Sequence, residues 1–160
     1  MLFGAAAATY LVDRLSKIWA EHSLANGPVD VVPGLLTLRF TTNSGGAFSF
    51  GTSAPWFFAT ATVVVSTVIV ATAFRARRPL HAIGLGLVLG GALGNLTDRL
   101  IRGPVLVGNV VDFIDLHYWP VFNVADTAIV IGALLLAITS FRPRRSGAGS
   151  GTPANRADGR

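Results

Sequence analysis

The chain has 160 residues and a formal net charge of +5, and 51% of its residues are hydrophobic while only 13% are charged. This composition excludes an ordinary soluble domain, and because the basic residues cluster beside apolar segments and in the tail, it favours a membrane surface over nucleic acid as the partner. The absence of cysteine excludes disulfides and thiolate nucleophiles, and the three histidines lack metal-ligand spacing, so we expect neither a metal nor another cofactor.

The first expected membrane span covers residues 2–20, which are apolar through Val12 and then carry Asp13 and Lys17. The two charged residues are four apart, so on a helix they share a face and neutralise each other. An interfacial salt bridge that only anchors the helix and a direct role near an active site are equally supported.

Residues 21–54 form the first expected outer loop, because they are mixed in polarity and rich in glycine and proline. The run LLTLRF follows a Pro-Gly turn signal and predicts a strand. Further on, Asn43 precedes Gly45 and Gly46, which indicates either a plain hairpin turn or an extended edge that binds a peptide through its main chain. In the second reading, Asn43 orients a catalytic group.

Residues 55–74 are uncharged and long enough to cross a hydrocarbon core of ~30 Å at 1.5 Å per residue, and residues 80–100 form the third expected span. In the third span, glycines recur every four residues at positions 86, 90 and 94 and predict close helix packing. Asn95, Asp98 and Arg99 can share one face at its far end. An interfacial capping cluster and a supporting role around a site stay open.

The second outer loop covers residues 101–118, and its run VLVGNVVDFID is expected to pair with LLTLRF as a small sheet. The fourth span covers residues 119–141, in which Asp126 is the only formal charge. We expect Asp126 about two helical turns, or roughly 10 Å, below Trp119, with Asn123 on nearly the same face. A lone carboxyl at membrane depth costs ~2.5–3.5 kcal/mol on insertion scales, which predicts a functional residue.

Arginines follow the second span and the fourth span, so these ends are expected in the cytoplasm. Both termini then lie in the cytoplasm and both outer loops face outward. Residues 1–141 form a single polytopic membrane domain in this interpretation. Residues 142–160 are rich in Gly, Ser and Pro and predict a disordered cytoplasmic tail.

Without a cysteine nucleophile or a metal site, a pair of carboxyl groups is the remaining means by which this chain could catalyse hydrolysis. Two carboxyls that share a site cannot easily both ionise, so one keeps a proton while the other takes a proton from water. Spacing alone leaves open whether Asp112 or Asp115 is the partner of Asp126. There are two competing interpretations. In one, the protein is a transporter with a helix-capping carboxylate and one buried acid; in the other, it is a non-catalytic packing protein.

Five sequence blocks, LVDRLSK, TTNSGGAFSF, GGALGNLTDRL, VVDFID and FNVADTAIVIG, occur in this order and together resemble the lipoprotein signal peptidases, the bacterial signal peptidase II family. The resemblance covers residues 11–132. It implies an all-α integral membrane protein with four transmembrane helices and a small extracytoplasmic β-cradle. It also implies an aspartic endopeptidase of the cell membrane that cuts diacylglyceryl-modified prolipoproteins just before the lipidated cysteine.

The resemblance further implies which residues form the site. It assigns Asp112 and Asp126 as the catalytic pair and leaves Asp115 out, because the family varies there. The family's polar and glycine positions around the site match Asp13, Lys17, Asn43, Gly45, Asn95, Asp98, Arg99 and Asn123. Gly46 departs mildly from the family, which often has alanine there. We expect membrane lipids as the surroundings, prolipoproteins as substrates, no nucleic acid partner and a monomer.

Overall fold

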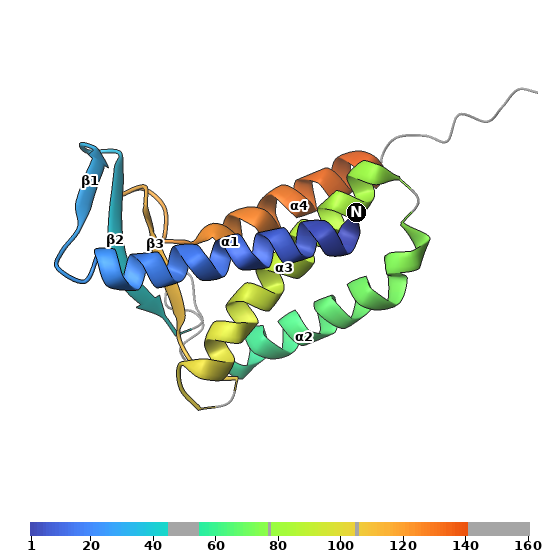
Figure 1. Ribbon diagram of the computed structural model, residues 1–160, viewed down its shortest axis with the longest axis horizontal. Coiled ribbons are helices and arrows are strands. Elements are labelled where there is room, and N and C mark those ends of the chain that lie inside the picture. The colour runs from blue at the N-terminus through green and yellow to red at the C-terminus, as the bar shows by residue number, and fades with distance from the viewer. Residues whose placement is uncertain (45–54, 77, 105, 141–160) are drawn as a thin grey trace, which may run out of the picture.

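The computed structural model describes residues 1–44, 55–76, 78–104 and 106–140, so Gly45, Gly46 and the tail lie outside the described residues. Within these ranges, four α-helices run side by side and a three-stranded sheet lies at the end opposite the N-terminus (Figure 1). In chain order, the elements are α1 (Leu2–Ser23), β1 (Val29–Val32), β2 (Leu36–Asn43), α2 (Pro55–Thr72), the short 3-10 helix η2 (Ala73–Arg75), α3 (Pro79–Ile101), β3 (Val110–Asp115) and α4 (Val124–Ser140).

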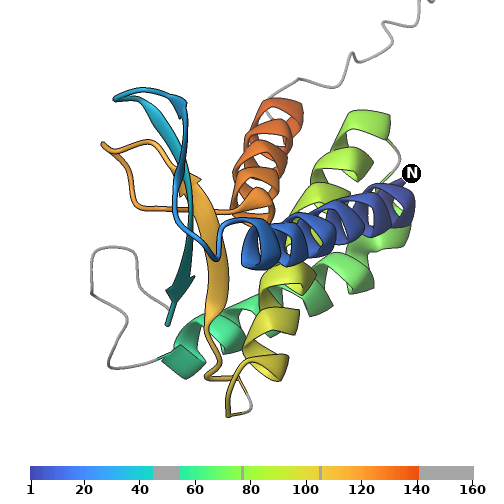
Figure 2. The same ribbon diagram turned by 60° about the vertical axis from the view of Figure 1, so that its left-hand side comes forward.

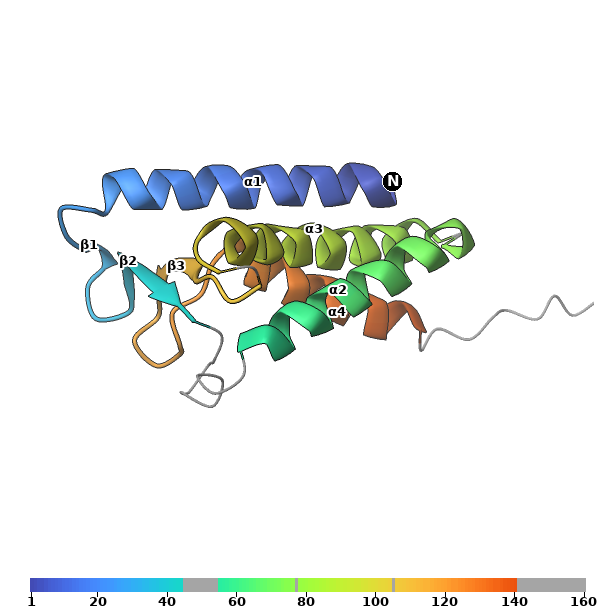
Figure 3. The same ribbon diagram turned by 90° about the horizontal axis from the view of Figure 1, so that it is seen from below.

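Helix α3 is the central helix, packed between α1 and α4, while α2 crosses it on another side (Figure 3). Its glycines make these contacts close. A Cβ atom on Gly86 would lie 2.7 Å from the Cβ of Ala5 in α1, and one on Gly91 would lie 2.9 Å from a side-chain carbon of Ile129 in α4. Real side chains do not tolerate such distances, so the predicted packing role of the glycine ridge is confirmed.

The sheet is antiparallel with the order β1-β2-β3, and β3 lies nearest the helices (Figure 2). The expected pairing of the two outer loops is confirmed, since Thr41 of β2 lies opposite Asp112 of β3. Val111 and Phe113 of β3 are buried against Ala20 and Leu24 at the end of α1. This apolar contact fixes the sheet on the helices. The sequence interpretation missed β1, whose four residues are all exposed.

Helix α4 begins later than the sequence predicts. Residues 119–123 are not helical, and Phe122 instead pairs with Ile114 of β3, with backbone N–H···O distances of 3.1 and 2.9 Å in the two directions. Because Phe122 extends the sheet, the helix starts at Val124. The expectation that Asp126 lies two helical turns inside a span is therefore wrong. Asp126 lies in the first turn of α4.

Among the described residues, α3 alone is both long enough and apolar enough to cross a membrane by itself. The segments Ala59–Arg75 and Val124–Ser140 are apolar but shorter. Helix α1 carries four charged side chains, and two of them, Asp13 and Lys17, are fully buried inside the protein. The described residues thus form four α-helices, whereas four membrane spans stay a prediction.

Candidate active site

One asparagine connects the two acids that the resemblance implies. The side-chain amide of Asn123 donates to Oδ1 of Asp112 at 2.6 Å, and its backbone N–H donates to Oδ2 of Asp126 at 3.3 Å. Asp112 comes from β3 and Asp126 from the first turn of α4. The late start of α4 is thus what brings a strand residue and a helix residue to the same place.

The position of Asp126 follows from a reciprocal helix cap. Asn123 directly precedes α4, and its Oδ1 accepts the backbone N–H of Asp126 at 2.9 Å, while the Asp126 carboxylate accepts the backbone N–H of Asn123. This is the geometry of a capping box, which satisfies two N–H groups that the helix leaves unpaired. Capping alone would explain Asp126, but it does not explain why a second acid is buried beside it.

Asp112 is that second acid, and only 2% of its surface is exposed. The Asn43 amide donates to its Oδ2 at 3.1 Å. Burial and the nearby charge of Asp126 raise the pKa of Asp112 to about 6. Asp112 therefore keeps a proton to a higher pH than an ordinary aspartate does.

Asp115 lies elsewhere. Three residues along β3 from Asp112, it points to the other face of the strand. Its carboxylate accepts the backbone N–H of His117 at 2.8 Å and the Arg39 Nε–H at 2.6 Å. These two contacts lower its pKa. The structure therefore brings Asp112, and not Asp115, to Asp126.

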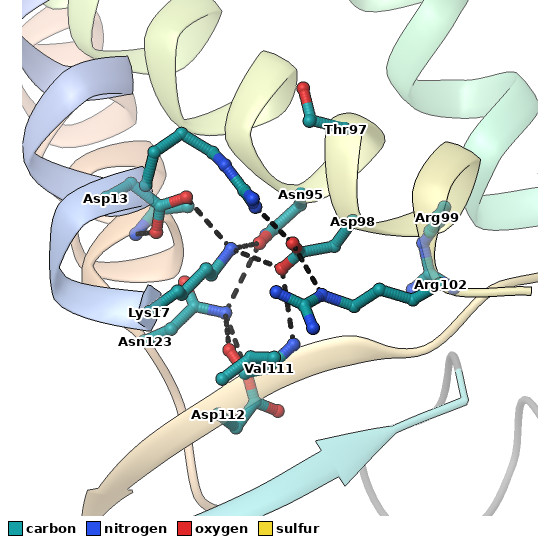
Figure 4. A network of polar contacts seen from close by, with 12 residues as sticks. Asp13, Lys17, Asn95, Thr97, Asp98, Arg99, Arg102, Val111, Asp112 and Asn123 are labelled. Atoms are coloured by element: carbon teal, nitrogen blue, oxygen red, sulfur yellow. Dashed lines mark hydrogen bonds and ion pairs between the residues drawn. The ribbon is translucent and has the colours of Figure 1, made fainter. Parts of the chain in front are cut away.

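A buried lysine organises the residues behind the pair (Figure 4). The ammonium group of Lys17 lies 2.9 Å from Asp13, 3.0 Å from Asp98 and 2.8 Å from the side-chain oxygen of Asn95. The amide of Asn95 in turn donates to Oδ1 of Asp126 at 2.8 Å. Lys17 thus forms two ion pairs and one hydrogen bond in the interior. It fixes the orientation in which Asn95 presents its N–H to Asp126.

Asp13 and Asp98 each fasten an element that carries one of the acids. Oδ1 of Asp13 accepts the backbone N–H of Ala125 at 2.9 Å and so joins α1 to the start of α4. Oδ2 of Asp98 accepts the backbone N–H of Val111 at 3.3 Å and so joins α3 to β3. The two carboxylates therefore fix the start of α4, which carries Asp126, and strand β3, which carries Asp112, to the helices α1 and α3.

Arg99 is only 7% exposed and approaches the same region. Its guanidinium donates to the carbonyl of Gly108 at 3.4 Å and lies within electrostatic range of Asp112 and Asp126. Of the residues expected around the site, Gly45 lies outside the described residues, and all the others belong to this network or lie beside it.

Three further charged residues belong to the network and were missed from the sequence. Arg14 and Arg102 both contact Asp98, and Arg102 also contacts Glu21. The four-residue spacing between Asp98 and Arg102 predicts this ion pair on a helix. The contacts of Arg14 and Glu21 cross from α1 to the end of α3, and nothing local in the sequence predicts them.

Because Asp112 is buried, we expect that replacing it with asparagine raises the stability of the protein by an amount that depends on pH. Because its folded pKa lies above the ordinary value of 3.8, this group stabilises the fold at low pH, and its contribution is lost as the pH rises through about 6. At ~1.4 kcal/mol per pKa unit, the loss at pH 7 is roughly 3 kcal/mol. Asp112→Asn avoids this loss but weakens one hydrogen bond by about 1 kcal/mol.

We therefore expect Asp112→Asn to unfold at a higher temperature than the wild-type protein at pH 7 in the same detergent, with the gain disappearing near pH 4. Thermal unfolding at the two pH values checks this. A variant that is less stable than wild type at both would contradict the burial of an ionisable Asp112.

Known proteins are similar to this chain in sequence and in fold. A family profile described as signal peptidase (SPase) II matches residues 5–142. The chain is similar to a protein named lipoprotein signal peptidase from Rhodococcus jostii (strain RHA1), with 45% identity over 86% of this chain and 71% of the relative. It is also similar to a protein of the same name from Mycobacterium avium (strain 104), with 41% identity over 88% of this chain and 78% of the relative.

A solved structure described as a bacterial membrane enzyme matches with a TM-score of 0.74 and 26% identity, over 85% of this chain and 84% of that one. The profile and the relatives span the elements that carry Asp112 and Asp126, and the solved structure has the same fold. The chain belongs to the signal peptidase II family.

Proposed function

We propose that the chain is a membrane aspartic endopeptidase that removes the signal peptide from diacylglyceryl-modified prolipoproteins, cutting just before the lipidated cysteine. The family is one of peptidases, and the relatives' name supports the substrate class. The observation that carries the aspartic mechanism is the single asparagine, Asn123, that binds Asp112 and Asp126 together.

In the proposed reaction, the two acids divide the work. Asp112 is the more deeply buried acid, and once substrate is bound it holds the shared proton and hydrogen-bonds the scissile carbonyl oxygen. Asp126 accepts bonds from Asn95 and Asn123, lines an open cavity, and acts as the carboxylate that takes a proton from water. The water attacks the carbonyl carbon, the C–N bond breaks, and the amine of the cysteine leaves with the proton that Asp126 took from the water. Asn43 keeps Asp112 in place.

We further propose four spans, with both termini in the cytoplasm and the acids near the outer face of the cell membrane. Exposed tryptophans support this placement, because Trp19 and Trp56 lie at the ends of α1 and α2 nearest the sheet and Trp119 lies in the loop between β3 and α4. Tryptophan prefers the membrane interface. Arg75 and Arg78 lie at the opposite end of α2 and α3, where the rule of cytoplasmic positive charge applies. In this arrangement residues 1–141 act as one domain and as a monomer.

Reporter fusions test this topology. Fusions at Arg77 and Arg145 are expected to report a cytoplasmic location, and fusions near Asp30 and Gly108 an external one. An external location for Arg77 would place the acids on the wrong side of the membrane and would overturn the four-span arrangement.

Cleavage by the purified protein tests the proposed function. We expect the protein in detergent to cut a prolipoprotein that carries diacylglycerol on its cysteine, to leave the unlipidated precursor intact, and to keep its activity in the presence of a metal chelator. Equal cleavage of the two precursors would contradict the substrate class, and inhibition by the chelator would contradict the aspartic mechanism.

A further inference from the structure

A cavity of about 300 Å³ lies beside Asp126, between the side of α4 and the loop that follows β3. Besides Asp126, its walls include Trp119, Phe122, Thr127, Val130 and Ile131. The α4 positions repeat at the spacing of one helix face, so the cavity follows α4 away from the acid. From Asp126 to Ile131, it extends along six residues, and the five steps between them rise roughly 7.5 Å at 1.5 Å per residue.

The cavity opens on the side of the helices. Trp119, Val130 and Ile131 are 65%, 58% and 47% exposed. In the proposed membrane arrangement, this side faces lipid. A group can therefore enter the cavity laterally from the bilayer and reach Asp126 without passing through water.

The walls offer almost nothing to a peptide backbone. Both backbone groups of Phe122 are bonded to β3, and the Thr127 hydroxyl donates to the carbonyl of Asn123 at 3.1 Å. Val130 and Ile131 lie within α4, where backbone groups bond one another. A peptide would bring an unpaired N–H and C=O for each residue, which is costly in apolar surroundings. A hydrocarbon chain brings neither.

We propose that this cavity holds one acyl chain of the diacylglyceryl group on the substrate cysteine, an inference that rests on the proposed function. A chain that moves from the bilayer into the cavity exchanges one apolar environment for another and gains little from burial. The effect of the cavity is therefore positional. A chain held along α4 fixes the lipidated cysteine, and the peptide bond before it, next to Asp126.

Filling the cavity tests this role. Ile131→Phe narrows it, and Ile138→Phe is a matched control, because Ile138 lies on the same helix, is 59% exposed and does not line the cavity. The substrates are one lipopeptide with dipalmitoyl glycerol or with dibutanoyl glycerol on its cysteine. We expect Ile131→Phe to raise KM for the dipalmitoyl substrate by about tenfold, the scale on which apolar pockets discriminate, and to leave the dibutanoyl substrate unaffected.

Ile138→Phe is expected to match wild type on both substrates. Thermal unfolding of each variant separates lost folding from lost binding, and Ile131→Ala, which enlarges the cavity, is expected to leave the KM of the dipalmitoyl substrate near that of wild type. An equal loss on both substrates by folded Ile131→Phe, or no loss on either, would overturn the acyl-chain site while leaving the proposed peptidase intact. Failure of wild type to cut either substrate would instead reject the proposed function.

Discussion

Asp126→Asn and Asp112→Asn are each expected to lower kcat/KM by at least a thousandfold, or about 4 kcal/mol of transition-state stabilisation at ~1.4 kcal/mol per tenfold. Asparagine keeps an acceptor for the cap formed with Asn123, so the fold survives. It cannot take a proton from water or share one with the other acid. Initial rates on a lipidated precursor, with folding checked by thermal unfolding, measure the effect.

The two acids act as one unit in this mechanism. The double variant is therefore expected to be scarcely slower than either single variant. Asp115→Asn is the matched control, because Asp115 lies on the same strand as Asp112 but its carboxylate contacts Arg39 at the surface. We expect its rate to stay within a small factor of wild type. Loss of cleavage in Asp115→Asn with cleavage preserved in Asp112→Asn would show that the pair is assigned wrongly.

Lys17→Met is expected to be the most destabilising single change among the supporting residues. Lys17 is fully buried, and its removal leaves Asp13 without a cationic partner in the interior. Breaking a buried ion pair in this way costs about 3–5 kcal/mol. The free energy of unfolding is expected to fall by that amount, and cleavage falls with it, since Asn95 loses the contact that orients it toward Asp126.

Two further variants show whether the effect arises from the buried charge. Adding Asp13→Asn to Lys17→Met removes the unpaired charge while keeping an oxygen for the Ala125 N–H, so part of the stability returns. Arg39→Met breaks the exposed pair with Asp115 and is expected to cost less than about 1 kcal/mol. A Lys17→Met effect as small as that of Arg39→Met would mean that the buried network does not hold the site together.

Periodic features of the fold were readable from the sequence. The glycines at four-residue intervals predicted close helix packing, which the structure shows between α3 and α1, and the β-branched run around Asp112 predicted a strand paired with the first loop. Helix α4 was harder, because the chain from Trp119 onward is largely apolar and uncharged on both sides of the true helix start at Val124. Its true start depends on Phe122 joining β3, which is a contact in space and leaves no periodic signal.

The candidate site shows the same division. The spacing of Asp13 and Lys17 predicted their ion pair, whose role in holding the start of α4 depends on a contact between α1 and Ala125, two segments far apart in sequence. Spacing alone could not choose between Asp112 and Asp115. The family resemblance made that choice, and the geometry agrees with it because residues three apart on a strand face opposite ways.

The most direct test of the account is the product formed from a diacylglyceryl prolipoprotein by the purified protein, identified by mass spectrometry. The account predicts one cut, with the lipidated cysteine as the first residue of the mature product, and no product with Asp126→Asn under the same conditions. A cut at another bond, or the same product from Asp126→Asn, would contradict it.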